Sequence, residues 1–340
     1  HETVLGREGD CLDLGQPDVA RRWHMVEREI DQRALKRPDK EETARGGETR
    51  GDQEAHRTSA ELGAQALTEA LHNAGLAYEE LDLILNASGS YDYPIPDTSC
   101  LIQRAMGKGR SGIPSFTIDA TCLSFIAALD VAASFLASGR YQRIAIVSAE
   151  ISSRSLNLDE KESATLLGDG AAAAIVGLAP EGEPSALLQS RLETYGDGAM
   201  YTYVKGGGNV LHPNARAHTE SHPSDFTFHM DGPKVLGMAF KQLRPFLKAL
   251  FKPLGFGLRD CEFIVPHQAS KGALDTARRL FRWREDQYID HLATHGNCIA
   301  ASIPMALYDA IDQNRISRGD RVCLLGTGAG LSVGGLVLVY

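Results

Sequence analysis

The chain has 340 residues, of which 43% are hydrophobic and 23% charged, so it can bury a large core and is neither disordered nor fibrous. Its formal net charge of −9 argues against nucleic acid as a partner, because binding to phosphates needs a basic surface. The apolar runs are too short to cross a membrane and residues 1–30 show no signal peptide, so we expect a cytoplasmic protein with no membrane partner.

The first half of the chain alternates helical and strand patterns. Residues 31–57 are almost entirely polar and indicate a solvated connection before the first clear helix pattern. Helical spacing of apolar residues and short apolar runs then predict, in chain order, a helix over 59–74, a strand over 81–87, a helix over 98–106, a strand over 114–120, a helix over 122–138, and strands over 143–149 and 172–178.

The helix that follows Cys122 is apolar almost all round, with Phe125, Leu129 and Phe135 on different faces. A helix of this kind is buried on every side, so we expect it at the centre of the protein. The strand over 143–149 is a continuous apolar run, which is typical of a strand buried on both faces.

The second half of the chain repeats this order of elements. The patterns predict a helix over 230–250, a strand over 261–265, a helix over 271–281, a helix that starts near 301 and has Pro304 in its first turn, and strands over 321–325 and 333–340. In both halves a glycine turn leads into a final apolar strand. We therefore predict two duplicated α/β halves, residues 1–180 and 181–340.

Cys122 lies in DATCLSF, at the junction between a predicted strand and the central helix. Backbone N–H groups and the positive end of the helix dipole favour a thiolate there, so we expect a thiol pKa well below about 8.5. A packed core cysteine is the alternative, and the position at the junction favours the nucleophile. The six cysteines contain no CxxC pair, which is typical of a reducing compartment.

Two further polar residues occupy similar junctions. His267 lies in IVPHQAS, after a predicted strand and before a helix, and Asn297 lies in HGNCIAASIP. Each alone is more often structural, as a buried histidine or a capping asparagine. Together with Cys122 they predict one convergent site. No His, Cys and Asp residues are clustered with the spacing of a zinc site, so we expect neither a metal nor a redox cofactor.

Two glycine-rich motifs need a structural explanation. GTGAGLSVGG leads into a strand instead of opening a helix, which is weak as a dinucleotide fingerprint. We expect a close backbone approach there, with an N–H near Ala329 that faces developing negative charge. In GDG at 168–170, Asp169 is either catalytic or part of a tight turn, and the turn is the better interpretation.

The motifs DATCLSF, LLGDGAAAAIVG, MDGPKVLGMAF, VPHQAS, HGNCIAASIPMAL and GTGAGLSVGG occur in an order that resembles the β-ketoacyl-acyl carrier protein synthase III family, from about Ser59 to Tyr340. The resemblance implies an α/β, thiolase-like fold of five layers, αβαβα, built from two duplicated halves. It implies that Cys122 accepts an acyl group, and that backbone N–H groups of Cys122 and Ala329 form an oxyanion hole. It further implies that His267 and Asn297 bind the carbonyl of the second thioester.

The activity that the resemblance implies is that of a ketosynthase III-like acyltransferase. An acyl group from acyl-CoA is loaded on the cysteine and then condensed, with loss of CO2, with a malonyl or β-ketoacyl thioester, in fatty-acid or polyketide synthesis. The substrates are thioesters of CoA or phosphopantetheine, and no cofactor is needed. The implied partners are acyl-CoA, acyl carrier protein and a second copy of the chain.

The resemblance also implies substrate-binding positions. Trp23 and Arg33 match the spacing of two family residues, of which the tryptophan stacks on the CoA adenine, and a core or interface tryptophan is the alternative. Gly232 and Ser270 are expected to bind substrate, and Ile95 is expected to line the acyl pocket of the dimer partner.

One stretch departs from the family pattern. After PHQA, the chain has Ser270, Lys271 and Gly272 where the family usually has asparagine, leucine and arginine. The missing arginine puts the usual contact with the carrier protein in doubt. Four arginines nearby are either its replacement or an ordinary solvated helix face: Arg278, Arg279, Arg282 and Arg284.

Other functions compatible with the same three residues remain open. One is head-to-head condensation of two acyl chains, and another is acyl transfer to an oxygen or nitrogen nucleophile. A cysteine hydrolase has the same residue order, but the chain lacks the C-G-[SA]-C-[WY] signature of papain-like proteases. A catalytically silent partner subunit is the last alternative, and such a subunit would not need the full set.

Overall fold

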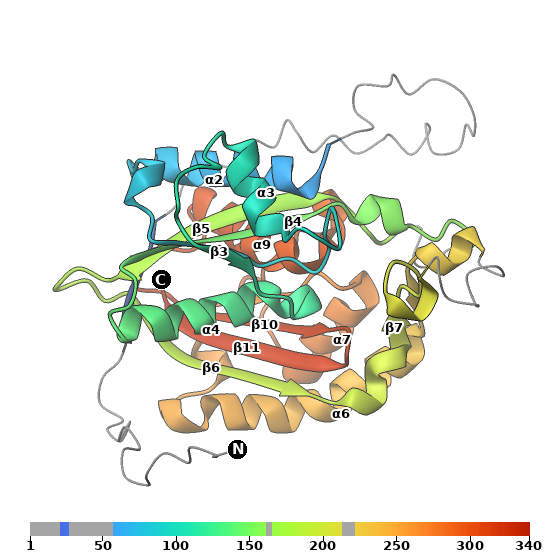
Figure 1. Ribbon diagram of the computed structural model, residues 1–340. Helices are drawn as coiled ribbons and strands as arrows, with labels where there is room; N and C mark the ends of the chain where they lie inside the picture. Colours follow the sequence, from blue (N-terminus) through green and yellow to red (C-terminus); the bar gives the residue numbers. More distant parts are fainter. Residues whose placement is uncertain (1–20, 27–56, 161–164, 213–221) are drawn as a thin grey trace, which may run out of the picture.

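The computed structural model describes residues 21–26, 57–160, 165–212 and 222–340, the first of these as a backbone path only (Figure 1). Arg33 and residues 31–56 of the predicted polar segment lie outside the described residues. The strands are β1 (Arg21–Val26), β2 (Leu83–Asn86), β3 (Ser115–Thr117), β4 (Arg143–Glu150), β5 (Gly170–Leu178), β6 (Ala186–Thr194), β7 (Thr202–Tyr203), β8 (His229–Met230), β9 (Phe263–Pro266), β10 (Arg321–Gly328) and β11 (Ser332–Val339). The α-helices are α2 (Ser59–Ala74), α3 (Thr98–Ala105), α4 (Ser124–Ala137), α6 (Gly232–Phe251), α7 (Lys271–Phe281), α8 (Leu292–His295) and α9 (Ser302–Asp312).

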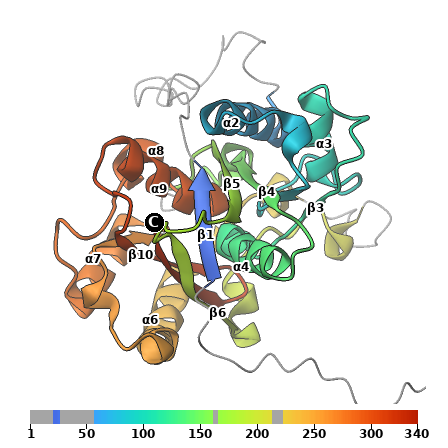
Figure 2. The same ribbon diagram turned by 90° about the vertical axis from the view of Figure 1, so that its left-hand side faces the viewer.

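The strands pair in the order β3-β2-β4-β5-β1-β6-β11-β10-β9. They form two groups, β3 to β5 and β6 to β9 in this order, which β1 joins. The helices α4 and α9 lie between the two groups, α2 and α3 cover the outer face of one, and α6 and α7 cover the outer face of the other (Figure 1). This arrangement gives the five layers αβαβα. Figure 2 shows β1 between β5 and β6, where it joins the two groups.

Burial along the central strands alternates between the middle layer and an outer layer. In β4, Ile144 and Ile146 pack with α4 and α9, whereas Ala145 and Val147 pack with α2. In β10, Leu324 faces the middle layer and its two neighbours face α6. Because successive side chains of a strand point to opposite faces, continuous apolar runs such as these need cover on both sides.

The two groups of strands have matching topology. In the first, β2 is parallel to β4 and β4 is antiparallel to β5; in the second, β9 is parallel to β10 and β10 is antiparallel to β11. The domain limits 1–180 and 181–340 remain a prediction. None of the described helices is both long and apolar enough to span a bilayer.

Most predicted elements are present with small shifts at their ends, but the start of α4 differs, and β1, β6, β7, β8 and α8 were not predicted. The chain does not enter a helix at Cys122: a 3₁₀ turn, η3 (Thr121–Leu123), precedes α4, which begins at Ser124. The strand β6 was not predicted, because its sequence ALLQSRLET carries polar residues on a partly exposed edge and lacks a clear apolar alternation. Its position depends on pairing with β11 and β1.

Candidate active site

Cys122 lies in the tight turn η3 at the start of the central helix. Thr121 has a φ of 53°, which a non-glycine residue adopts only where its surroundings require it. The amide of Leu123 donates to Ala120 O at 3.1 Å, and the amide of Ala120 donates to Ser124 Oγ at 3.0 Å. These bonds close the turn around Cys122 and hold its backbone in place.

The thiol of Cys122 does not have the lowered pKa that we predicted from its place beside a helix. Although the residue is partly accessible to solvent, burial and, as the second cause, the carboxylate of Glu150 together raise the pKa of Cys122 to about 12. Hydrogen bonds from the backbones of Ala329 and of Cys122 itself act in the opposite direction. Because α4 begins two residues later, the positive end of its dipole is not aimed at the sulfur. The rise in the thiol pKa caused by desolvation is therefore larger than the decrease caused by the N–H groups.

His267 follows β9 and is 5% exposed. Burial lowers the pKa of His267 to about 4, so the imidazole is neutral at pH 7. Its Nδ1 is buried and has no hydrogen-bond partner among the described residues. Burying an unprotonated nitrogen without a partner costs less free energy than burying an unpaired N–H group. This difference favours the tautomer with the proton on Nε2.

Asn297 precedes a second 3₁₀ turn, η11 (Ile299–Ala301), which leads into α9. Its Oδ1 accepts from the amide of Ile299 at 2.9 Å, which fixes the orientation of the side chain. Its Nδ2 lies 3.4 Å from Ala269 O, two residues after His267. The NH2 group is therefore the end of Asn297 that faces the histidine segment.

Two glycines bring the three segments together. A Cβ atom at Gly326 would lie 2.8 Å from His267 Cβ and 3.1 Å from Leu123 Cδ2, so only glycine allows these residues to approach β10. A Cβ atom at Gly89 would lie 3.2 Å from both Thr121 Cα and Ile299 Cγ2. The turns that hold Cys122 and Asn297 thus meet at Gly89, and the cysteine and histidine segments meet at Gly326.

The motif GDG supports the turn of Asn297. A Cβ atom at Gly168 would lie 2.1 Å from His295 O, and one at Gly170 would lie 2.5 Å from Met305 Sδ. The carboxylate of Asp169 accepts from the amide and the hydroxyl of Ser153 at 2.8 and 2.7 Å. This geometry favours the structural interpretation of Asp169 over the catalytic one.

A cavity of about 550 Å³ opens beside His267, between β9 and β10 on one side and α6 and α7 on the other. That volume is in the range of small-molecule sites. Gly232 and Ser270, both predicted to bind substrate, line it, and most of its other lining residues are apolar. Cys122 and Asn297 are not among the described lining residues, so the cavity reaches the site at His267 and Gly326.

Two other predicted positions are Trp23 and Ile95. Trp23 is in β1, with its backbone opposite Leu178; its side chain lies outside the described part, so its role stays a prediction. Ile95 is 87% exposed, in a loop whose Tyr91 and Tyr93 are each 55% exposed. An apolar loop this exposed is consistent with the predicted contact with a second subunit.

Glu150, at the end of β4, lies near the site, and no pattern in the sequence indicated it. It is fully buried, and burial raises the pKa of its carboxyl to about 7. Its carboxylate interacts electrostatically with Cys122. In the sequence it stands at the end of an apolar strand, and only the tertiary packing brings it near the cysteine.

His291, His295 and Asp309 form a cluster close to Asn297 in sequence, with ligand atoms within 4.8 Å of one another. His291 Nδ1 lies 3.0 Å from Asp309 Oδ2, and Thr294 Oγ1 lies 2.8 Å from His295 Nδ1. These residue types can hold Zn²⁺. Both Nδ1 atoms are hydrogen-bonded, whereas Nε2 of His291 is buried without a partner among the described residues, and we assign no ion to the cluster. The expectation of no metal stays a prediction.

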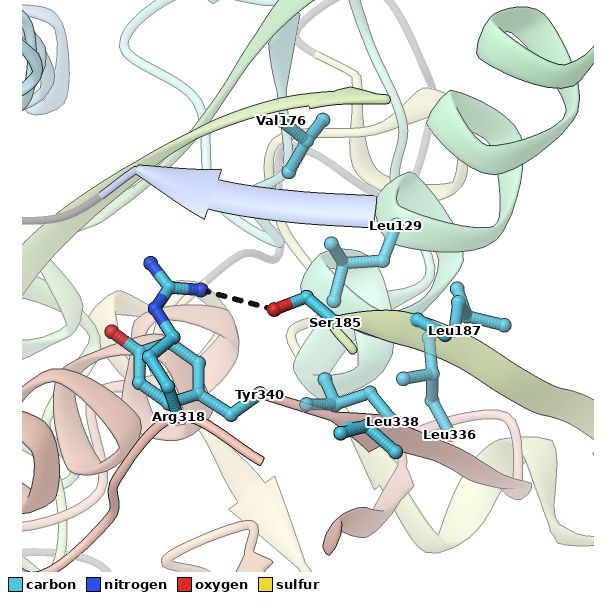
Figure 3. Close-up of a pocket in the computed structure, with 10 residues that line it drawn as sticks. Leu129, Val176, Ser185, Leu187, Arg318, Leu336, Leu338 and Tyr340 are labelled. Atoms are coloured by element: carbon cyan, nitrogen blue, oxygen red, sulfur yellow. Dashed lines mark hydrogen bonds between the residues drawn. The ribbon is translucent and has the colours of Figure 1, made fainter. Parts of the chain in front are cut away.

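A second cavity, of about 40 Å³, lies among apolar side chains of β5, β6, β11 and α4 (Figure 3). Arg318 lies over the ring of Tyr340, 4.1 Å from its centroid, and its Nη1 is 3.4 Å from Ser185 Oγ. The space is too small for a thioester, and we assign no chemistry to it.

Comparison with protein families gives two matches, one in each half of the chain. A model described as 3-oxoacyl-[acyl-carrier-protein] synthase III matches residues 116–196, and one described as the C terminal of 3-oxoacyl-[acyl-carrier-protein] synthase III matches residues 252–340. These ranges contain Cys122, His267 and Asn297.

Curated relatives cover most of the chain. The β-ketoacyl-[acyl-carrier-protein] synthase III of Syntrophomonas wolfei is 32% identical over 274 residues, 81% of this chain and 80% of the relative. The enzyme of the same name from Desulfitobacterium hafniense is 34% identical over 281 residues, 82% of each chain.

Solved structures agree with these matches. The crystal structure of 3-oxoacyl-[acyl-carrier-protein] synthase III from Aquifex aeolicus VF5 has a TM-score of 0.74 at 27% identity and covers 84% of this chain and 85% of that one. The corresponding structure from Pseudomonas aeruginosa PAO1 has a TM-score of 0.73 at 26% identity, with 84% of each chain covered. The predicted thiolase-like α/β fold is confirmed. The chain therefore belongs to the β-ketoacyl-[acyl-carrier-protein] synthase III family of condensing enzymes.

Proposed function

We propose that Cys122 accepts an acyl group from acyl-CoA and then transfers it to the carbanion formed from a malonyl or β-ketoacyl thioester. The observation that carries this proposal is the junction of the turns of Cys122 and Asn297 with the segment of His267, at Gly89 and Gly326. Family membership supports the same assignment.

The backbone N–H groups of Cys122 and Ala329 form the oxyanion hole for the first step. Both groups stabilise negative charge on the Cys122 sulfur in the free protein. When the sulfur attacks the thioester, the negative charge moves to the carbonyl oxygen, and N–H donors fixed by the backbone stabilise it without reorganising. The proton leaves with the CoA thiol, so the step ends with acyl-Cys122 and free CoA.

His267 and Asn297 serve the second step. Nε2–H of the neutral imidazole and the NH2 group of Asn297 donate to the carbonyl of the second thioester. As its carboxylate departs as CO2, the electron pair passes to this carbonyl as an enolate, which both donors stabilise. The carbanion attacks acyl-Cys122, a carbon–carbon bond forms as the C–S bond of the acyl-cysteine breaks, and the cysteine sulfur takes up a proton from solvent.

The 550 Å³ cavity is the place for the phosphopantetheine arm. Its walls near His267 are formed by Ala269, Ser270 and Gly232, and the arm is long enough to carry a thioester from solvent to a buried site. Ser270 also caps α7, since its side chain accepts from the amide of Ala273 at 3.2 Å.

Carrier protein and a second subunit are the partners that we propose. The end of α7 and the residues after it present three exposed arginines, Arg279, Arg282 and Arg284, to an anionic partner. The exposed loop with Tyr91, Tyr93 and Ile95 offers an apolar contact to a second copy of the chain.

Intact-mass measurement after incubation with acyl-CoA tests the first step. We expect a mass increase equal to the acyl group, lost in Cys122→Ser, and a β-ketoacyl product once malonyl thioester is added. In Asn297→Ala, loading should persist while condensation falls about 10²-fold, because one enolate donor is missing. No loading of Cys122 would overturn the proposal, and loading followed by hydrolysis, or by transfer to oxygen or nitrogen, would replace its second step.

A further inference from the structure

Glu150 is a fully buried carboxyl group that the proposed reaction leaves without a role. Four donors surround it: the amide of Gly89 at 2.6 Å, the amide of Ser90 at 3.0 Å, the hydroxyl of Ser90, and the amide of Ala300. A buried carboxylate with this many donors is held in one place. It links the end of β4 to the loop after β2 and to η11.

The amide of Ala300 belongs to a turn that repeats the turn of Cys122. Ile299 has a φ of 46° where Thr121 has 53°, and the amide of Cys298 donates to Ser302 Oγ at 2.9 Å where that of Ala120 donates to Ser124 Oγ at 3.0 Å. Ala300 therefore occupies in η11 the position of Cys122 in η3. Its N–H group is the counterpart of the oxyanion-hole N–H of Cys122.

We propose that Glu150 is a positioning residue: its carboxylate accepts from the amide of Ala300 in the second turn, holds the segment of Asn297 against β4, and places a negative charge beside the turn of Cys122. This inference rests on the proposed function of Cys122 and Asn297. In η11 the carboxyl group of Glu150 already accepts from the N–H group of the turn. In η3 the corresponding N–H group is available for the oxyanion that forms during the reaction.

The carboxylate of Glu150 lies close to the turn of Cys122, because it accepts from the amide of Gly89, where a Cβ atom would lie 3.2 Å from Thr121 Cα. A negative charge at this place opposes a thiolate on Cys122. Glu150 is the main charged group that opposes the thiolate, Asp119 opposes it more weakly, and His267 is neutral at pH 7. The pKa of Glu150 is about 7, so its charge grows as the pH rises through neutrality. A thiol kept protonated in the empty site is less exposed to oxidation and alkylation, since both reactions need the thiolate.

Alkylation of Cys122 by iodoacetamide, followed by peptide mass spectrometry from pH 6 to 10, tests the charge. In Glu150→Gln we expect alkylation about tenfold faster at a given pH, because a like charge has been removed. Condensation should become about tenfold slower, because the glutamine NH2 group opposes the surrounding donors and loosens η11. Glu150→Asp keeps the charge on a shorter side chain, so it should slow condensation and leave alkylation slow.

Two further variants keep the test valid if Glu150→Gln fails to fold. In Ser90→Ala, the lost hydroxyl raises the pKa of Glu150, which then carries less charge at pH 7 to 8, so alkylation should be faster there. Ser152→Ala removes another buried hydroxyl just after β4, one that donates to Gly168 O, and should leave the alkylation profile unchanged. Unchanged alkylation in folded Glu150→Gln and Ser90→Ala would overturn the inference. Failure of the wild type to load acyl groups would instead overturn the proposed function.

Discussion

The turns η3 and η11 have nearly the same backbone and different chemistry. Each has a residue of positive φ, a serine hydroxyl that accepts the amide four residues earlier, and a long buried helix after it. The central residue of η3 is the proposed nucleophile, Cys122, and the equivalent residue of η11 is Ala300. Duplication thus produced two equivalent sites for an anion, of which we propose that one is catalytic.

The strand that faces each turn explains the difference. The last residue of β10 is Gly328, where a Cβ atom would lie 2.6 Å from Thr121 Oγ1, and the next residue, Ala329, donates its amide to Cys122. The last residue of β4 is Glu150, whose carboxylate accepts from Ala300. A strand that ends in glycine lets the turn of Cys122 approach its backbone, whereas a strand that ends in glutamate places a carboxylate against the N–H group of Ala300.

Moving the thiol from one turn to the other should have the largest effect. We expect Cys122→Ala to abolish acyl loading and to slow condensation about 10³-fold or more, because the covalent route is lost. Adding Ala300→Cys should not restore loading, since Glu150 already occupies that N–H site. Intact mass with acyl-CoA measures both variants, and circular dichroism controls for folding. An acylated residue 300 would contradict the contrast between the turns.

Adding a methyl group where the histidine segment meets β10 should have an intermediate effect. Gly326→Ala places a Cβ atom 2.8 Å from His267 Cβ, so we expect a loss of up to about 3 kcal/mol in the free energy of unfolding. Gly237→Ala is a matched control at an exposed position of α6, with no atom within 4 Å of the new Cβ, and should stabilise the protein by about 0.5–1 kcal/mol. Urea unfolding measures both; equal values would argue against the close approach at Gly326.

The dependence of stability on pH should show the smallest effect, with opposite signs in the two halves. Glu150 has a pKa of about 7 against an ordinary 4.5, so its contribution is present below 4.5 and lost as the pH rises through 7. His267 has a pKa of about 4 against 6.5, so its contribution is present above 6.5 and lost as the pH falls through 4. Each amounts to at most about 3 kcal/mol over the whole interval between its two pKa values, since one pKa unit corresponds to about 1.4 kcal/mol.

Urea unfolding from pH 4 to pH 8, in the wild type and in one variant for each group, separates the two groups. Glu150→Gln should remove the loss of stability that accompanies the rise from pH 5 to 7, while His267→Gln should remove the loss that accompanies the fall from pH 6.5 to 4. If the free energy of unfolding of Glu150→Gln still fell with rising pH as steeply as that of the wild type, another group would be titrating in this range.

Most of the regular structure could be predicted from local patterns. The helix α2 has the predicted bounds, because Thr58 and Glu61 form a capping box and Gly75 ends the helix in the left-handed conformation. The apolar runs of β4 and β10 predicted buried strands. In contrast, β6 gave no clear signal, because its neighbours, and not its own sequence, hold it in the sheet.

The site was predicted in part. Cys122 and His267 were found because each stands at the junction of an apolar strand and a helix, Asn297 because it stands between a loop and a helix, and all three because they lie in motifs of the family. The prediction of a low thiol pKa was wrong, because burial and a charge 28 positions away in the sequence act on the sulfur. Glu150 has no local signal that separates it from any glutamate at the end of a strand.

The sequence by itself determined the alternation of helices and strands, the central position of α4 and the three residues of the proposed reaction, because apolar spacing and capping act over a few residues. Only the tertiary structure decided which strand end faces which turn, and hence the protonation of Cys122 and the place of Glu150. Electrostatic interactions depend on distances in space and on burial, and the packing of the whole chain sets both.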